Sequence, residues 1–98
     1  MPFIQIIEFQ TDRIDKMDAI ADEWLSASAG WRTTTRSVIT QDRDQPGTYV
    51  QMVEFPSYEA AMENSNHPET GDFAQRIAAL CSAPPTFRNL EVERVDDM

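Results

Sequence analysis

The sequence predicts an α+β domain in which two helices pack on one face of a four-stranded antiparallel sheet, in the order βαββαβ. Three observations lead to this prediction. Two strand-like stretches, FIQIIEF at 3–9 and YVQMVEF at 49–55, share one pattern of aromatic, aliphatic and glutamine positions. Stretches with apolar residues at helical spacing follow them, and two further strand-like stretches complete the order. A chain of 98 residues has room for one such domain.

The first half of the chain predicts a strand, a helix and a second strand. Residues 3–10 form the first strand, and Thr11 or Asp12 can then accept hydrogen bonds from the first turn of a helix. Between residues 13 and 27, apolar side chains recur every three or four positions. Residues 31–41, WRTTTRSVITQ, are rich in β-branched side chains and predict an edge strand or one that lines a wet cavity.

The second half predicts a hairpin, a broken helix and a last strand. Ser57 can cap a helix, and the stretch NSNHPET at 64–70 interrupts it. Pro68 cannot continue the preceding helix but suits the first turn of the next one. The remaining expected segments are the loop 42–47, the strand 49–55, the second helical stripe 73–81 and the strand 86–95.

Right-handed crossovers place the first and third strands together at the centre of the sheet, and we expect them to run parallel. These strands carry FIQIIEF and YVQMVEF. The repeated pattern is therefore explained by two half-domains that contribute equivalent central strands.

Alternation along these two strands separates their side chains into two faces. We expect the helices to cover the face that carries the aromatic residues and both glutamines. The opposite face still shows Ile4, Ile6, Val50 and Met52, and exposed apolar patches usually mark interfaces. This pattern predicts a homodimer in which two sheets meet, although the C-terminal segment could instead fold back over the patch. The helix-facing residues are Phe3, Gln5, Ile7, Phe9, Tyr49, Gln51, Val53 and Phe55.

Composition excludes several classes of partner. The chain carries 17 acidic and 8 basic residues, a formal charge of -9, which repels nucleic acid and anionic membranes. No apolar run is long enough to span a bilayer, and the N-terminal stretch MPFIQIIEF lacks the basic region of a signal peptide. The single cysteine, Cys81, cannot form an internal disulfide and fits a cytoplasmic protein.

Two stretches resemble small proteins of one known group: VEFPSYEAAMENSNHPETGDFA at 53–74 and PPTFRNLEV at 84–92. With the length, the element order and the two-sided apolar sheet, they make the chain similar to the dimeric α/β-barrel superfamily, in its antibiotic-biosynthesis-monooxygenase-like group. The resemblance implies that residues 1–98 form one ferredoxin-like domain, that two copies form a dimeric α/β barrel, and that each holds a ligand pocket between sheet and helices. Members include cofactor-independent oxygenases of aromatic polyketides, heme-degrading enzymes and proteins of no known activity.

The candidate site residues each allow a structural and a functional interpretation. Gln5 and Gln51 either satisfy each other and the nearby backbone or orient a ligand. His67, the only histidine, lies in the break between the two helical pieces and is a candidate general base, or simply a loop residue beside Pro68. Trp24 belongs to the apolar stripe of the first helix, but it could also form the flat wall of a pocket.

Two further residue types complete the candidate ligand-binding set. Tyr49 can place a hydroxyl at the edge of the pocket. Seven of the eight basic residues are arginines, and four of these fall on predicted strands. Arg36 and the other strand arginines either pair with strand glutamates or bind an anionic group of a ligand.

The sequence predicts neither a metal nor a cofactor. His67 with Glu69 is no ligand set, and Cys81 belongs to a helical stripe without a basic neighbour. The heme-degrading branch uses an asparagine on the first strand, where this chain has Gln5 and Ile7, so heme degradation is not carried over. We expect a cofactor-independent, monooxygenase-like enzyme for a small aromatic or polyketide-like molecule. The alternative is a non-catalytic barrel that binds a small ligand or serves as an accessory module.

Overall fold

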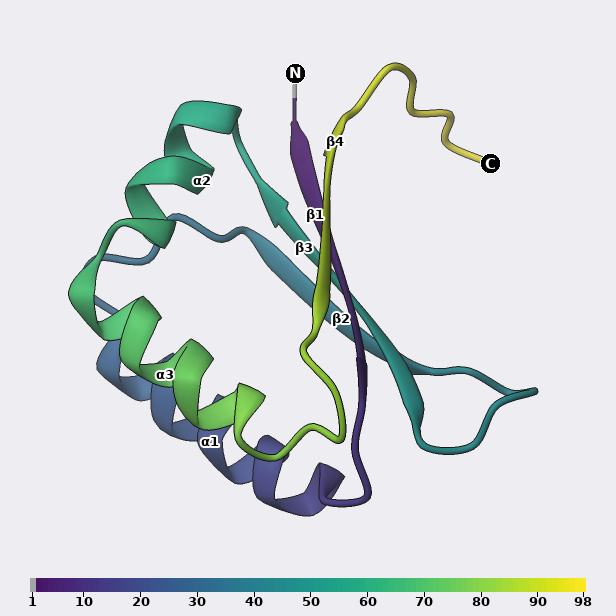
Figure 1. Cartoon of the computed structure of the whole chain (residues 1–98). Coiled ribbons are helices and arrows are strands. Elements are labelled where there is room, and N and C mark those ends of the chain that lie inside the picture. Colours follow the sequence, from purple (N-terminus) through teal and green to yellow (C-terminus); the bar gives the residue numbers. More distant parts are fainter. Residues whose placement is uncertain (1) are drawn as a thin grey trace.

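The structure, a computed structural model, describes residues 2–98 as one sheet with all helices on one side of it (Figure 1). Its element order confirms the predicted α+β class, with the second helix in two pieces. The elements are β1 (Phe3–Gln10), α1 (Ile14–Ala27), β2 (Arg36–Gln41), β3 (Thr48–Phe55), α2 (Tyr58–Ser65), α3 (Pro68–Ala78) and β4 (Thr86–Glu91). None of the helices in this described part is long and apolar enough to cross a membrane.

The sheet has the strand order β2-β3-β1-β4, and all neighbouring strands are antiparallel. The central position of β1 and β3 is confirmed, but the prediction that they run parallel is wrong. The hairpin loop between β2 and β3 reverses the chain, so β3 runs opposite to β2. The strands that run parallel are β1 with β2 and β3 with β4, and a central strand separates the two members of each pair.

The register of β1 and β3 confirms the predicted faces, because Phe3 lies opposite Phe55 and Phe9 lies opposite Tyr49. Phe3 is 2% exposed and packs edge-on against Tyr58 of α2. The core cluster of Phe3, Val53, Phe55 and Ala61 therefore lies between the sheet and α2. The aromatic face is the helix-facing one.

The predicted strand at 31–41 is shorter in the structure, since β2 begins only at Arg36. The backbone amides of Trp31 and Arg32 donate to the Ser28 carbonyl and prolong the end of α1. Thr33 then bonds to α2, with its hydroxyl donating to the Ala60 carbonyl at 2.6 Å. These contacts hold Thr33 against α2, between the end of α1 and the start of β2. The last strand is also shorter than predicted, because β4 ends at Glu91.

The first helix begins at a residue that the sequence did not predict as its cap. Arg13 is the N-cap of α1 and makes no side-chain cap hydrogen bond. The Thr11 hydroxyl instead accepts from the Arg13 amide and donates to the Leu80 carbonyl. Thr11 therefore ties the start of α1 to the end of α3.

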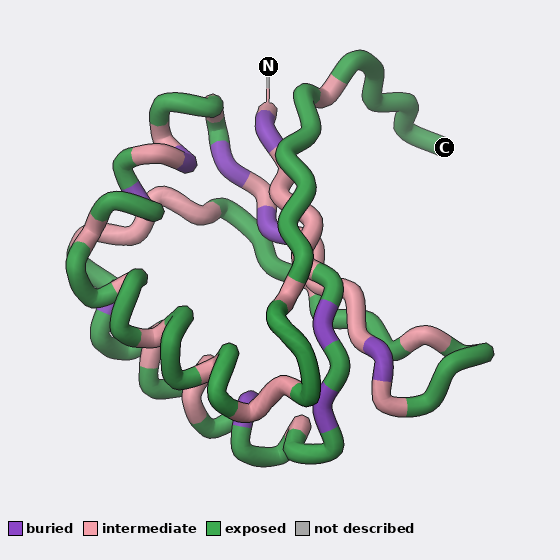
Figure 2. Tube along the Cα trace, viewed as in Figure 1, coloured by how far each residue is buried: buried purple, intermediate pink, exposed green. Residues whose placement is uncertain are grey.

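Helices α1 and α3 lie further from the sheet than α2 does. Met17 is the only buried residue of α1, and α3 has none. Figure 2 shows most of the buried segments on the sheet strands and α2, while α3 is exposed or intermediate along its length. An exposed ion pair, Arg76 Nη2 to Glu23 Oε2 at 2.6 Å, joins α3 to α1, and its hydrogen bond lowers the pKa of Glu23. Helices α1 and α3 are thus held to each other rather than to the sheet. This arrangement leaves a space between these two helices and the middle of the sheet.

The opposite face of the sheet has no helix over it (Figure 1). Residues 93–98 are exposed and run past the end of the sheet, so they do not cover this face. The strand register brings six apolar side chains together there. This apolar face consists of Ile4, Ile6, Val38, Val50, Met52 and Leu90.

Candidate functional site

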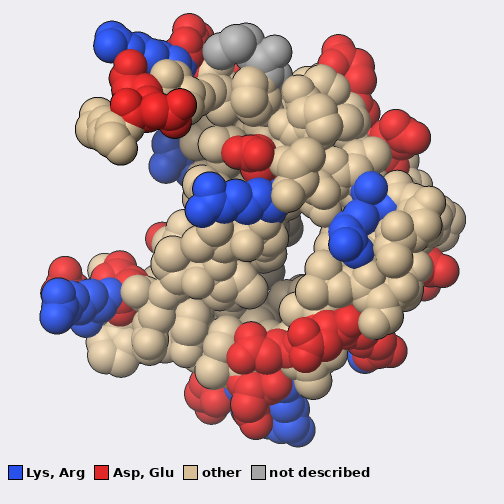
Figure 3. All heavy atoms as spheres, turned by 180° about the vertical axis from the view of Figure 1, so that it is seen from behind, with Lys and Arg blue, Asp and Glu red and all other residues tan. Residues whose placement is uncertain are grey.

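A cavity of about 510 Å³ lies between the sheet and helices α1 and α3. This volume is in the range of small-molecule pockets, about 300–1,000 Å³. Figure 3 shows an open passage between the two layers of the molecule. Most of the wall is apolar or aromatic. These wall residues are Ile7, Ile39, Val53 and Phe55 from the sheet and Ala21, Trp24, Leu25, Phe73, Ala74 and Ile77 from the helices.

Three aromatic side chains line this cavity, those of Trp24, Phe55 and Phe73, and most of the other rings on this side of the sheet pack outside it. Phe3 packs on Tyr58, and Phe9 stacks on Tyr49 with ring centroids 5.5 Å apart. Trp24 lies edge-on to Trp31, at 6.3 Å. The large rings thus pack in pairs, and the space between the layers stays open to a ligand.

Gln5 and Gln51 both line the cavity, but they do not bond to each other. Gln5 Nε2 donates to Asn89 Oδ1 at 3.2 Å, and Gln51 Nε2 donates to Ser37 Oγ at 2.9 Å. The register explains this, because Gln5 lies opposite Val53 rather than opposite Gln51. An amide can meet a hydroxyl or another amide with either end, so both glutamines can turn to suit a ligand.

Asn64, at the end of α2, is a cavity residue that the sequence did not single out. Its side chain lines the cavity although the residue is only 5% exposed. Asn64 Oδ1 accepts from the Thr33 amide at 3.2 Å, and a backbone amide can only donate. The contact fixes which end of the Asn64 amide is oxygen, and Nδ2 donates to no other residue among 2–98.

The Nδ2 atom of Asn64 has no hydrogen-bond partner among residues 2–98, and it is not fully buried. Within the described residues, no fully buried side-chain nitrogen or oxygen lacks a hydrogen-bond partner. An Nδ2 without a protein partner must therefore be accessible, and the cavity is what Asn64 lines. In the sequence, Asn64 belongs to NSNHPET, where it predicts only a turn. Its burial depends on Thr33, 31 residues away.

Two arginines, Arg32 and Arg36, border the cavity. Arg32 Nη1 donates to the Leu25 carbonyl at 2.8 Å and to Ser28 Oγ at 3.3 Å. Its guanidinium carbon lies 6.0 Å from the centre of the Trp24 ring. Arg36 lies opposite Glu54 in the register. Neither arginine forms an ion pair within residues 2–98, so the predicted pairing with strand glutamates is not formed inside this chain.

His67 lies outside the residues that line the cavity, as does Tyr49. The His67 ring stacks on Trp31, with centroids 3.5 Å apart and planes 3° from parallel. As the N-cap of α3, it accepts from the Glu69 amide through Nδ1 at 3.2 Å. The nitrogen that a general base would need free is thus engaged in the cap. Trp24, by contrast, forms part of the cavity wall.

Replacing His67 by alanine is expected to lower the free energy of unfolding by about 1–3 kcal/mol, from the lost cap and the lost stack. His67→Asn is expected to retain most of the cap, because asparagine is a good N-cap residue, and to lose about half as much. Urea unfolding followed by circular dichroism measures both values. Equal losses in the two variants would contradict the capping role.

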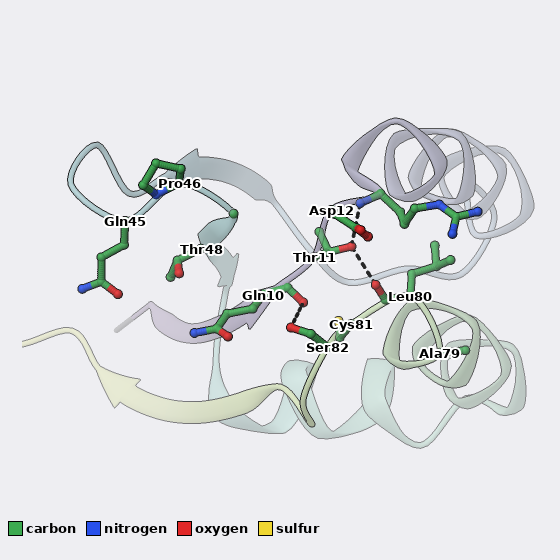
Figure 4. A pocket seen from close by; sticks show the side chains of 12 residues that line it. Gln10, Thr11, Asp12, Gln45, Pro46, Thr48, Ala79, Leu80, Cys81 and Ser82 are labelled. Carbon is green, nitrogen blue, oxygen red and sulfur yellow. Dashed lines mark hydrogen bonds between the residues drawn. The ribbon is translucent and has the colours of Figure 1, made fainter.

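A second groove lies at the other end of the sheet, formed by the loops around Thr11, Gly47 and Cys81 (Figure 4). The loops are joined by hydrogen bonds, among them Thr11 Oγ1 to the Leu80 carbonyl and the Ser82 amide to the Gln10 carbonyl. Burial raises the pKa of the Cys81 thiol, so it stays protonated at neutral pH. This groove offers no activated nucleophile.

Within residues 2–98, no three His, Cys, Asp or Glu side chains gather in a group that could hold a metal ion. The polar groups of the cavity are amides, hydroxyls and guanidiniums. Such groups bind organic ligands through hydrogen bonds.

No protein-family model matches the sequence, and no curated protein matches it. Solved structures match its fold. A mutant of SnoaB, a cofactor-independent oxygenase from Streptomyces nogalater, superposes with a TM-score of 0.80 at 13% identity, over 96% of this chain and 95% of that chain. An antibiotic biosynthesis monooxygenase superposes at 0.73 with 16% identity, over 96% and 100% of the two chains.

This chain has the fold of the antibiotic biosynthesis monooxygenases. The predicted resemblance to the antibiotic-biosynthesis-monooxygenase-like group is confirmed at the level of fold. Rv0793 from Mycobacterium tuberculosis is similar too, with a TM-score of 0.77 at 15% identity over 99% of this chain and 100% of that chain. The superpositions with these three structures cover 96–99% of this chain.

Proposed function

We propose that the chain is a cofactor-independent monooxygenase for a small aromatic or polyketide-like molecule, bound between the sheet and helices α1 and α3. The open cavity of about 510 Å³ carries this proposal. Its apolar and aromatic residues suit a flat ring system, and the polar residues between them can orient it. The fold shared with SnoaB, a cofactor-independent oxygenase, supports the same reaction class.

The reaction needs no bound cofactor, because an electron-rich substrate supplies the electrons itself. A ring CH₂ between two aromatic rings becomes a carbonyl, and one O₂ is consumed. Both hydrogens leave with the second oxygen atom as water. In this scheme the free Nδ2 of Asn64 donates to the substrate oxygen and favours its ionised form. Gln5 and Gln51 hold the ring system in position.

Oxygen uptake with an anthrone tests the proposal. The wild type is expected to consume O₂ in proportion to the substrate, and Ala21→Phe is expected to abolish uptake by filling the cavity from α1. Asp18→Ala, on an exposed position of the same helix, serves as the matched control. No uptake by the wild type on anthrones or related phenols would contradict the proposed function.

His67 as the general base remains a prediction, and the same assay tests it. An asparagine at position 67 can cap α3 but cannot accept a proton at neutral pH. If His67 is the base, His67→Asn loses uptake. Because Nδ1 of His67 is engaged in the cap of α3, we expect the His67→Asn protein to retain oxygen uptake.

The alternative function is a non-catalytic barrel that binds a small ligand. It is favoured by one observation, namely that no side chain lining the cavity is a histidine or a carboxylate that could serve as a strong base. A protein that binds the aromatic ligand with normal affinity but consumes no O₂ would establish this alternative.

We also propose that two copies pair through the apolar face. Six apolar side chains lie there, with no helix over them, and the C-terminal residues run past them. A second copy offers a surface of the same kind, as a twofold dimer requires.

A further inference from the structure

The cavity differs in charge from the rest of the molecule. The chain has 17 acidic and 8 basic residues. Among the residues that line the cavity are Arg32 and Arg36, but no aspartate or glutamate. In Figure 3, basic side chains lie on both sides of the passage between the two layers. The charged residues that line the cavity of this acidic protein are therefore all basic.

Arg32 is the better placed of the two arginines to meet a ligand. Its Nη1 is held by the Leu25 carbonyl and Ser28 Oγ at the end of α1, so the guanidinium is fixed at the cavity wall. Its Nε and Nη2 donate to no other residue among 2–98, and no carboxylate neutralises it. The positive charge of Arg32 and its Nε and Nη2 donors are therefore available to bind a ligand.

Arg36 is less suited to this role. It is the first residue of β2 and lies opposite Glu54, whose neighbours Val53 and Phe55 point toward the helices. Because side chains alternate along a strand, Arg36 and Glu54 point to the other face. Arg36 therefore borders the cavity at its mouth, and Arg32 is the cation of its wall.

The surroundings of Arg32 indicate the shape of the missing partner. The guanidinium lies 6.0 Å from the centre of the Trp24 ring, and both residues line the cavity with Phe73 and Ile77. A planar, delocalised cation binds a planar oxyanion with two parallel hydrogen bonds. The apolar walls reduce the screening of that contact by water.

We propose that the cavity selects a planar aromatic anion, a carboxylate or an ionised phenol, with its oxygens on Arg32 and its ring against Trp24. The proposal rests on the proposed function in that it assigns the ligand class of the same cavity. It requires no turnover, so binding alone tests it. Without Arg32 the overall charge of -9 would disfavour any anion.

The test compares naphthalene-2-carboxylate with naphthalene-2-carboxamide, which have nearly the same shape, by isothermal titration calorimetry at neutral pH. The wild type is expected to bind the carboxylate roughly tenfold tighter or more, and added salt should weaken only that binding. Arg32→Gln is expected to abolish the preference. Arg43→Gln removes the same charge from the exposed hairpin loop and is expected to keep it.

Arg32 also donates hydrogen bonds at the end of α1, so Arg32→Gln removes a structural contact together with the charge. A second variant, Arg32→Lys, keeps the positive charge. It is expected to retain part of the preference, which a merely structural role of Arg32 would not explain. Equal affinity of the wild type for the two ligands, binding of neither, or a full preference in a folded Arg32→Gln protein would overturn the proposal. A carboxylate preference without any oxygen uptake would remove the oxygenase function alone. Oxygen uptake without such a preference would remove only the anion proposal.

Discussion

Asn64→Asp is expected to fold like the wild type and to consume oxygen about 100-fold more slowly, as is usual when one donor to a developing oxyanion is removed. The new carboxylate can still accept from the Thr33 amide, so the link between α2 and residues 31–35 is kept. What changes is the group that faces the cavity. Two N–H donors are replaced by a negatively charged acceptor, which repels an ionised substrate.

The control for this variant is Asn66→Asp, which adds the same charge two positions later at the exposed end of α2. It is expected to keep the wild-type rate. Initial rates of oxygen uptake and thermal unfolding would be measured on both proteins. If Asn64→Asp is as fast as Asn66→Asp and equally stable, Asn64 does not contact the reacting molecule.

Ile6→Glu is expected to convert the proposed dimer into a folded monomer. Ile6 lies at the centre of the apolar face, between Met52 of β3 and Arg88 of β4. A carboxylate there would lose its water on pairing and meet its own counterpart from the second copy. Even beside Arg88, a charge that is buried in an apolar interface and faces its own counterpart costs several kcal/mol, equivalent to a shift in the dimer dissociation constant of about 100-fold or more.

Size-exclusion chromatography with light scattering measures this change. Gln75→Glu, on the exposed side of α3, carries the same charge and is expected to remain dimeric. Circular dichroism would show that Ile6→Glu keeps its secondary structure, since Ile6 lies outside the core cluster. A wild type that runs as a monomer, or an Ile6→Glu protein that runs as a dimer, would contradict the pairing through this face.

The local pattern of apolar and polar residues predicted most of the fold. Alternation in FIQIIEF and YVQMVEF predicts which face carries Phe3 and Phe55, and the register confirms it. Pro68 marks the break between α2 and α3 because it cannot donate a backbone hydrogen bond. The strand at 31–41 is where local pattern failed. Its β-branched residues suit a strand, but Thr33 bonds to α2 instead.

The residues of the candidate site were harder to predict from local sequence pattern than the fold was. Gln5, Gln51 and Trp24 follow from strand alternation and helical periodicity, and all three line the cavity. His67 and Tyr49 do not line it, because each is engaged with another ring. Asn64 was predicted only as a turn residue, because a turn asparagine is ordinary in sequence. Arg32 was predicted only as one of four strand arginines, which either pair with glutamates or bind an anionic group of a ligand.

Residue pattern alone thus determined the class of this protein, its element order and the two apolar faces of its sheet, because side-chain direction follows from strand and helix periodicity. Only the tertiary structure decided whether the space between the layers was open, and which polar groups it holds. That outcome depends on how far α1 and α3 lie from the sheet, and on contacts such as Thr33 to Asn64 between residues distant in the chain. Periodicity carries no information about either, since both arise from packing between elements.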